Sequence, residues 1–225
     1  MKKIGMIVAV EMGAVLARYG TAKEITVKHG FEVHTYESDA YTLYVVNAGI
    51  GELAAAAATQ ELISCYGVEL VVNFGVVGGL TEEMAQTKTC IIEKLVHYDF
   101  DLAEIDNVPT GQYPGYESIY IPTSIELVEK AVKLQPELKK VVCASADKFI
   151  GTREKKIALH EKFGADICEM EAAGIVLTCN RNNIPVISIK TVSDGISGGA
   201  DEFYAEVQRT SLICLEITDR IIREL

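Results

Sequence analysis

The chain has 225 residues, of which 49% are hydrophobic and 24% are charged, a composition typical of one globular domain with a substantial core. We therefore expect a single domain over residues 1–225. The formal net charge of −11 disfavours nucleic acid as a partner, because affinity for nucleic acid depends on Lys and Arg that neutralise phosphates. The net charge does not argue against a small-molecule ligand.

The cysteines and the apolar runs indicate in which cellular compartment the protein is found. The six cysteines are scattered, with no CxxC pair and no Cys/His cluster at zinc spacing, so we expect reduced thiols in the core and no metal site. The apolar run after Lys2 and Lys3 is interrupted by Glu11, which predicts a first strand and not an export signal. No apolar segment approaches the roughly 20 residues that span a bilayer. We expect a cytoplasmic protein with no membrane partner.

Apolar runs that predict buried strands recur along the chain, and helical patterns lie between and after them. In chain order the strands are Lys3–Val10, Tyr41–Asn47, Leu70–Phe74, Lys140–Ala144 and Pro185–Val192. The helices are Glu52–Tyr66, Ser124–Leu134, Arg153–Phe163, Glu171–Asn182 and a last one from Asp201 to near the C-terminus. This alternation predicts a largely parallel sheet flanked by helices.

The segments Glu24–Lys28, Phe31–Glu37 and Tyr41–Val46 lie closer together than the other predicted strands. The residues between them, His29-Gly30 and Ser38-Asp39, are typical of turns. We therefore expect a local antiparallel meander here. Elsewhere the strands are parallel, and ligands of parallel sheets gather at the carboxyl ends of the strands. Residues that directly follow a predicted strand are thus the candidates for a site.

Two glycine-rich segments follow predicted strands. The first, residues 47–51, leads into a helix, so that backbone amides can approach a ligand at the helix N-terminus. The second, Gly75 to Gly79, leaves room for a flat ring or a sugar, and it lacks the lysine and hydroxyl of a phosphate-binding P-loop. Each pattern alone is equally consistent with a tight turn.

Two further motifs place carboxylates near the ends of strands. Glu169 and Glu171 flank Met170 at the start of a helix, where a carboxylate either caps the helix or accepts hydrogen bonds from two vicinal hydroxyls, such as those of ribose. Asp194 ends a central strand and precedes a glycine-rich loop, where an Asx turn is the simpler use of an aspartate.

The order and spacing of these motifs resemble the purine nucleoside phosphorylase and uridine phosphorylase superfamily, and within it the bacterial methylthioadenosine/S-adenosylhomocysteine nucleosidases. The most specific matches are residues 169–174, 191–194 and 75–79. Further matches are residues 99–101, 111–115 and 145–150. The resemblance implies an α/β fold of three layers, α/β/α, with a central mixed, partly barrel-like sheet. It also implies a homodimer, in which the segment around Pro114 closes the neighbouring subunit's pocket.

The resemblance assigns roles to individual residues. It implies that Asp194 protonates N7 of a leaving purine, which calls for a pKa raised by burial. It implies that Glu171 holds the 2′- and 3′-hydroxyls of ribose and that Met170 lies beneath the sugar. Phe149 would stack on the base, and the backbone of Ile150 would recognise the purine edge. The other positions expected to bind the substrate are Ile50, Val76, Gly78 and Ser193.

Two positions depart from the nucleosidase pattern. Hydrolases of that branch use a glutamate where this chain has Gly13 to activate water, and an arginine where it has Lys190. Glu11 is retained, and we expect both Glu11 and Lys190 to act in catalysis. Lys190 is the only matched cation for a phosphate, and a lysine is a weaker directional clamp for phosphate than an arginine. Val76 stands where phosphorylases commonly have Ser or Thr.

The expected activity is cleavage of the N-glycosidic bond of a purine nucleoside, without a metal or an organic cofactor. A nucleosidase is favoured by the chain length and by residues 111–115. A phosphorylase that uses phosphate is favoured by the missing glutamate and by residues 191–194. A nucleoside-binding paralogue without turnover is the third alternative, and Asp194 disfavours it because binding alone needs no acid. The sequence leaves open the nucleophile, the 5′-substituent and the choice between a 6-amino and a 6-oxo purine.

Overall fold

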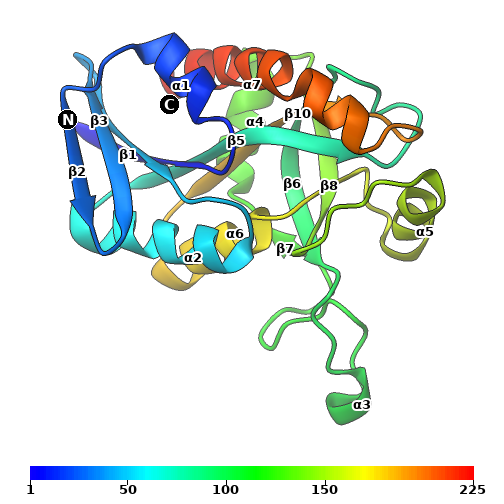
Figure 1. The fold of residues 1–225 in the computed structure, drawn as a ribbon. Coiled ribbons are helices and arrows are strands. Elements are labelled where there is room, and N and C mark those ends of the chain that lie inside the picture. Colours follow the sequence, from blue (N-terminus) through cyan, green and yellow to red (C-terminus); the bar gives the residue numbers. More distant parts are fainter.

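The computed structural model describes all 225 residues, and one ten-stranded sheet runs through it (Figure 1). The strands are β1 (Lys2–Val8), β2 (Glu24–Lys28), β3 (Phe31–Glu37), β4 (Tyr41–Asn47), β5 (Leu70–Gly79), β6 (Thr89–His97), β7 (Ile121–Pro122), β8 (Lys139–Ser145), β9 (Ile167–Glu169) and β10 (Val186–Asp194). The helices are α1 (Met12–Tyr19), α2 (Glu52–Glu61), the π-helix η1 (Leu62–Tyr66), α3 (Ala103–Asp106), α4 (Ile125–Leu134), α5 (Arg153–Phe163), α6 (Ala172–Asn182) and α7 (Ala200–Ile222).

The sheet closes on itself around β5. Neighbours along the sheet follow the order β10-β6-β8-β9-β5-β1-β4-β3-β2, and β10 also pairs with β5. Five strands, β5, β10, β6, β8 and β9, therefore form a closed ring. Strand β5 belongs both to this ring and to the open part of the sheet. Its residues Leu70–Asn73 pair with β1 of the open part, and Gly78–Gly79 pair with β9 of the ring. The prediction of a mixed, partly barrel-like sheet is confirmed.

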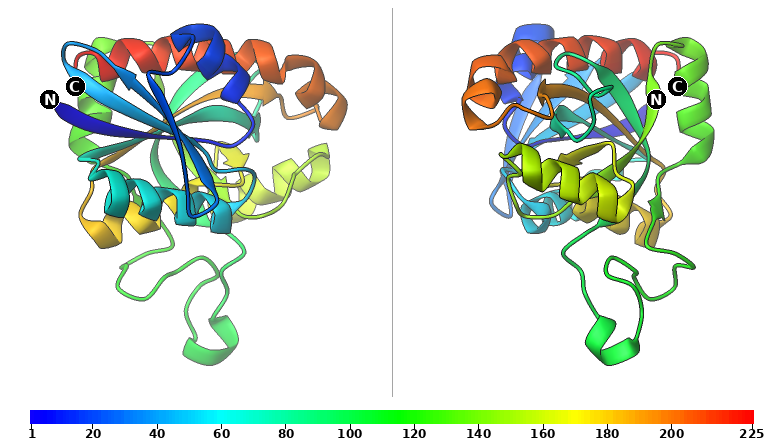
Figure 2. Two further views of the ribbon diagram at one scale, coloured as in Figure 1. Left: turned by 60° about the vertical axis from the view of Figure 1, so that its left-hand side comes forward. Right: turned by 90° about the vertical axis from the view of Figure 1, so that its right-hand side faces the viewer.

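Helices cover both faces of the open part of the sheet, which makes three layers (Figures 1 and 2). Successive residues of β1 face opposite sides: Met6 packs in the core beneath α1, α4 and α7, whereas Ile7 packs in the core beneath α2 and α6. This alternation is the two-residue period of a strand that is buried on both faces. The expected three-layer α/β/α fold is confirmed.

The structure corrects several sequence-based boundaries. Pairings β2–β3 and β3–β4 form the expected antiparallel meander, but β10–β6 and β5–β9 are antiparallel too, so the sheet is less parallel than the alternation suggests. Gly75 to Gly79 is not a loop: it continues β5, because β10 and β9 supply hydrogen bonds on both sides. Strand β1 ends at Val8, and helix α1 and strands β6, β7 and β9 were not predicted.

A long excursion between β6 and β7 leaves the body of the protein and carries α3 near its tip (Figures 1 and 2). At its base the rings of Phe100 and Tyr113 stack with centroids 3.8 Å apart. This stacked pair joins the two limbs of the excursion, which is hereafter called the arm (residues 99–120). Pro114 lies within it. No helix of the protein combines the length and the apolarity that a membrane span requires.

Candidate active site

An apolar cavity of about 340 Å³ lies where the carboxyl ends of β1, β5 and β10 meet. Its size and its largely hydrophobic lining are typical of a small-molecule site. The lining residues are Ala9, Val10, Glu11, Ile50, Val76, Val77, Gly78, Phe149, Cys168, Glu169, Met170, Glu171, Ser193, Asp194, Ala200, Phe203 and Tyr204. Residues from every quarter of the chain thus converge at one edge of the sheet.

Asp194 is the last residue of β10 and is almost fully buried. The register of β10 against β5 shifts between Val192 and Asp194, and this irregularity re-aims the side chains at the end of the strand. The Ser193 hydroxyl donates to Asp194 Oδ1 at 2.9 Å, and Lys156 Nζ donates to Oδ2 at 2.6 Å. Burial raises the pKa of Asp194 above its ordinary value, and the bonds from Lys156 and Ser193 oppose this rise.

The two glutamates around Met170 have different tasks. Glu169 Oε2 accepts hydrogen bonds from the backbone amides of Glu171 and Ala172, so Glu169 caps helix α6. The Glu171 side chain makes no capping bond; its Oε1 accepts from the Gly51 amide at 3.0 Å. Burial and the nearby charge of Glu169 raise the pKa of Glu171 to about 7. Of the two, Glu171 is the carboxylate that keeps lone pairs for a ligand.

Glu11 lies in a nest of backbone amides at the ends of β1 and β5. The amides of Ala9 and Val10 donate to Glu11 Oε2 at 3.2 and 2.9 Å, and the amide of Val76 donates to Oε1 at 3.0 Å. Such nests bind anions. The side chain fits because Gly75 has none: a Cβ there would lie 2.6 Å from Glu11 Oε1.

Lys190 lies behind this cavity and does not line it. It is buried, and its Nζ lies 3.4 Å from Glu169 Oε2. Burial lowers the pKa of Lys190, but the carboxylates Glu169, Glu171 and Glu11 outweigh burial, and the pKa is raised. The positive charge of Lys190 therefore compensates the negative charge of these carboxylates.

Aromatic side chains form the outer wall of the cavity. Phe149 is half exposed and meets Phe203 of α7 edge to face, with centroids 5.8 Å apart. Tyr204 follows Phe203 and also lines the cavity. A flat ring that enters the cavity would find an aromatic face beside it.

Comparisons with known proteins fit this geometry. A family model described as "Phosphorylase superfamily" matches residues 3–225. The chain belongs to the phosphorylase superfamily. The resemblance inferred from the motifs is therefore confirmed, and the chain is an enzyme of this superfamily.

Similar members of the superfamily carry two kinds of name. An aminodeoxyfutalosine nucleosidase of Helicobacter pylori (strain J99) is 30% identical over 94% of this chain and 95% of its own length. A 5′-methylthioadenosine/S-adenosylhomocysteine nucleosidase of Hydrogenovibrio crunogenus is 30% identical over 85% of both chains. A crystal structure of the H. pylori methylthioadenosine/S-adenosylhomocysteine nucleosidase with butyl-thio-DADMe-Immucillin-A superposes with a TM-score of 0.93 at 27% identity, covering 100% of this chain and 99% of that one.

Most of the residues predicted for the superfamily site do line the cavity. They are Glu11, Ile50, Val76, Gly78, Phe149, Met170, Glu171, Ser193 and Asp194. Lys190 does not, in contrast to the expectation, and Ile150, for which a backbone contact was expected, does not line the cavity either. Lys190 is held beneath the cavity by Glu169, and the Ile150 side chain packs against a separate apolar cluster around Leu159 and Phe163.

Two parts of the site, the aromatic pair Phe203 and Tyr204 and the buried Lys156, were not predicted from the sequence. Phe203 and Tyr204 come from the first turns of α7, which was predicted only as a core-facing helix. Lys156 comes from α5, 38 residues before Asp194, and its charge in a helical segment is typical of a solvated face. The sequence of α5 alone does not reveal that Lys156 is buried, because the carboxylate that pairs with it, Asp194, lies in β10.

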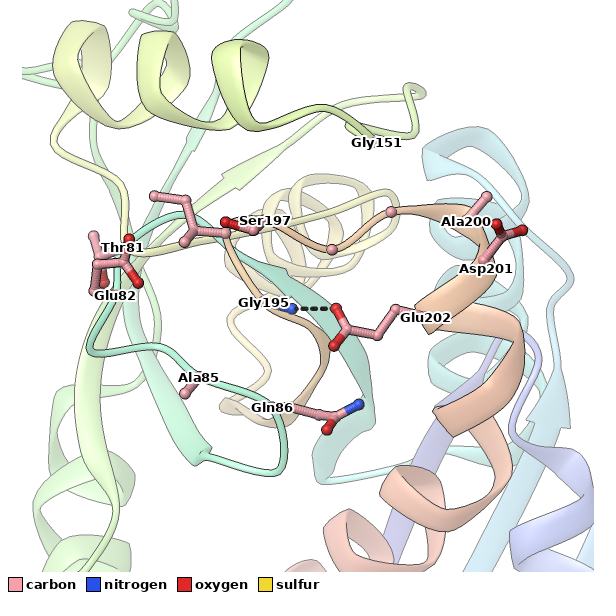
Figure 3. Close-up of a pocket in the computed structure, with 13 residues that line it drawn as sticks. Thr81, Glu82, Ala85, Gln86, Gly151, Gly195, Ser197, Ala200, Asp201 and Glu202 are labelled. Carbon is pink, nitrogen blue, oxygen red and sulfur yellow. Dashed lines mark hydrogen bonds between the residues drawn. The ribbon is translucent and has the colours of Figure 1, made fainter.

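A second, larger cavity of about 760 Å³ is lined by the Gly195–Gly199 loop and by residues 81–86 (Figure 3). Its walls are mostly polar, and Glu82, Asp201 and Glu202 contribute carboxylates. Within it Glu202 accepts a hydrogen bond from the Gly195 amide at 3.0 Å (Figure 3). An apolar purine ring finds little to pack against here, so the smaller cavity is the better site for superfamily chemistry.

One group of metal-ligand side chains lies away from both cavities. Ligand atoms of His29, Glu61 and Cys65 lie within 4.8 Å of one another, although Cys65 was expected in the core and is exposed. His29 Nδ1 and Glu61 Oε2 are 2.9 Å apart and form a hydrogen bond, whereas Glu61 Oε1 is buried without a partner. The cavity at the strand ends is the site to which the superfamily chemistry is assigned.

Proposed function

We propose that this enzyme hydrolyses the N-glycosidic bond of a purine nucleoside, with Asp194 as the acid at purine N7. The observation that carries the proposal is the convergence of Asp194, Glu171 and Phe149 on one apolar cavity. An acid, a hydroxyl-binding carboxylate and an aromatic face are what a base and a ribose require of a site. The nucleosidase names of the similar proteins support the same reaction.

The chemistry follows from the charges that develop as the bond breaks. Cleavage between the anomeric carbon and purine N9 leaves electron density on the base and positive charge on the sugar, so stabilising both lowers the barrier. Asp194 neutralises the base by protonation. Glu171 holds the ribose hydroxyls, and its negative charge favours an oxocarbenium-like transition state.

We assign water rather than phosphate as the nucleophile. Besides the acid Asp194, three carboxylates, from Glu11, Glu169 and Glu171, line the cavity. A phosphate dianion in this cavity would face their repulsion. In addition, Glu11 occupies the backbone-amide nest, which is the part of the cavity that would best receive a phosphate.

Glu11 also offers a base for the water, in place of the glutamate absent at Gly13. Its Oε2 has two amide donors, whereas its Oε1 has one, from Val76. A carboxylate oxygen has two acceptor sites, so Oε1 keeps one for a water molecule. We therefore propose that Glu11 orients the attacking water and takes its proton.

The substrate class follows from the two kinds of similar protein. Both the aminodeoxyfutalosine nucleosidases and the methylthioadenosine/S-adenosylhomocysteine nucleosidases match over most of this chain. We propose a substrate of the methylthioadenosine or S-adenosylhomocysteine type, with aminodeoxyfutalosine as the first competitor to test.

The experiment measures release of free base from methylthioadenosine, S-adenosylhomocysteine, aminodeoxyfutalosine, adenosine and inosine, each with and without inorganic phosphate. We expect release without phosphate and no stimulation when phosphate is added. Strict dependence on phosphate would show a phosphorylase. Tight binding without release in either condition would show a nucleoside-binding paralogue.

A further inference from the structure

Lys156 is a fully buried lysine, with 0% of its surface exposed, although it belongs to a helix whose neighbouring positions are exposed. Its ammonium group donates to Asp194 Oδ2 at 2.6 Å, to Gly195 O at 2.7 Å and to Asp194 O at 3.3 Å. These contacts use all three of its hydrogen-bond donors. Lys156 therefore joins α5 to the end of β10 and to the start of the loop that follows it.

Burial of a lysine charge is costly unless a counter-charge compensates it. The carboxylate that binds Lys156 is Asp194, the acid of the proposed function. Among the other titratable groups near the pair, Cys168 of β9 has a pKa raised to about 12 by burial, and Glu202 of α7 bonds to the Gly195 amide. Neither competes for the ammonium group, so Lys156 and Asp194 form a closed pair.

The ion pair between Lys156 and Asp194 makes it difficult for Asp194 to act alone as the acid. A carboxylate that accepts a hydrogen bond from an ammonium group is stabilised in its charged form, and a charged carboxylate has no proton to give. The ammonium group of Lys156 donates a proton along its 2.6 Å hydrogen bond to Asp194 Oδ2. The proton missing from Asp194 is thus present one hydrogen bond away.

We propose that Lys156 is the proton source behind Asp194, so that the two side chains act as one acid. The proposal rests on the proposed function, because it takes Asp194 as the group that contacts purine N7. Lys156 itself acts through Asp194 and is a positioning and proton-supplying residue.

The step balances as follows in atoms and electrons. The bond between the anomeric carbon and N9 breaks, and its electron pair goes to the base. N7 takes a proton from Asp194, and Asp194 takes one from Lys156, which leaves a neutral amine and a carboxylate. Water adds its oxygen to the anomeric carbon and gives a proton to Glu11. When the products leave, Glu11 releases this proton to solvent, and Asp194, which lines the opened cavity, takes one up and passes it back to Lys156.

The first test compares two leaving groups in the full-length protein. Lys156→Met removes the charge and keeps an unbranched apolar side chain in the buried space. Cleavage of the best nucleoside from the panel above should fall by about 10²-fold or more, the usual effect of a lost general acid. Cleavage of 4-nitrophenyl riboside, whose leaving group needs no proton, should stay near the wild-type rate. Lys155→Met, an exposed neighbour on the same helix, is the matched control and should change neither rate.

The second test is the direction in which the pH profile shifts. If Lys156 only balanced the charge of Asp194, its removal would raise the pKa of Asp194 and move the decline in activity to higher pH, which would contradict the proposal. In the wild type the nucleoside should be cleaved up to alkaline pH. In Lys156→Met the activity must follow protonation of Asp194 alone, so its decline should begin at lower pH. Equal losses on both leaving groups together with an unshifted pH profile would overturn the proposal.

A double-variant cycle covers the case in which Lys156→Met leaves Asp194 unpaired and the protein unfolds. Lys156→Met with Asp194→Asn replaces the ion pair by two neutral side chains of similar size. Because members of one catalytic unit are not additive, the double variant should be no less active than Asp194→Asn alone. Losses that multiply would contradict a shared proton. If Asp194→Asn alone keeps full activity, the proposed acid fails; if it is inactive while Lys156→Met is fully active, only this inference fails.

Discussion

At the scale of single residues, Glu11 shows how backbone amides and a glycine position a carboxylate in this site. Glu11 reaches the cavity from a position where the nucleosidase pattern places no catalytic group, and three backbone amides fix its orientation. The missing side chain of Gly75 provides the space. Nothing fills the space within 4 Å of a Cβ built on Gly13, where the pattern has its glutamate. We propose that Glu11 takes over the function of the glutamate that is absent at Gly13.

The first prediction concerns this residue. Glu11→Gln should lower kcat for base release without phosphate by about 10²-fold or more, because an amide cannot take a proton from water. The KM should change little, since the proposed sugar and base contacts remain. Steady-state kinetics on the best nucleoside measure both values. Glu24→Gln, on the exposed strand β2, is the control; an unchanged kcat in Glu11→Gln would remove Glu11 from the mechanism.

The second prediction uses the raised pKa of Glu171, which burial and Glu169 shift from 4.5 to about 7. Between these values the folded protein keeps a proton that the unfolded chain has lost. The free energy of unfolding should therefore fall as pH rises through this window and level off above it. In Glu171→Gln this contribution disappears, so the variant should gain stability relative to the wild type between about pH 5 and about pH 8. Urea unfolding at both pH values measures the difference; exposed Glu137→Gln should show none.

At the scale of elements, close contact between α2 and α6 positions Glu171 in the cavity. A Cβ on Gly174 would lie 2.3 Å from the backbone oxygen of Glu52, so glycine is required for this helix contact. The same contact brings Gly51 to within hydrogen-bond distance of Glu171. The two helices were predicted from periodicity and composition, but their approach was not, because it depends on residues 120 positions apart.

The third prediction tests this contact. Gly174→Ala should destabilise the protein by about 1–3 kcal/mol, because the new methyl group meets backbone that cannot move aside. Gly13→Ala is the matched control: it lies in α1, is exposed and has open space around it. It should leave stability unchanged or raise it by up to about 1 kcal/mol, the difference in helix propensity. Equal effects of the two variants in urea unfolding would contradict the packing argument.

At the scale of the whole molecule, the arm projects from the side that carries α2 and α6 (Figures 1 and 2). Ile105 in the arm is 79% exposed, and Leu53 in α2, close in sequence to the cavity residue Ile50, is 84% exposed. Exposed apolar side chains mark an interaction surface where they are part of a contiguous patch. We propose that this side joins two copies of the chain in a homodimer, as the resemblance implies.

The fourth prediction is that sedimentation finds two chains per particle. Leu53→Asp and Ile105→Asp should each shift the particle to a single chain, because a charge in the interface has no partner. Val27→Asp, on β2 and 74% exposed in the wild type, is the control and should remain a dimer. A monomeric wild type would contradict the proposal, and so would dimers that tolerate both interface charges.

The sequence by itself determined many of the elements and most of the candidate residues, although it did not predict α1, α3, β6, β7 or β9. The two-residue and helical periods of apolar residues are local, so they predicted the helix over Arg153–Phe163 and placed Asp194 and Glu171 next to strand ends. Tertiary structure decided which of these side chains meet. It closed the five-strand ring, moved Lys190 out of the cavity, placed Glu11 in the amide nest and brought Lys156 to Asp194. The physical reason is that each of these outcomes depends on contacts between distant segments, which the local pattern of either segment does not specify.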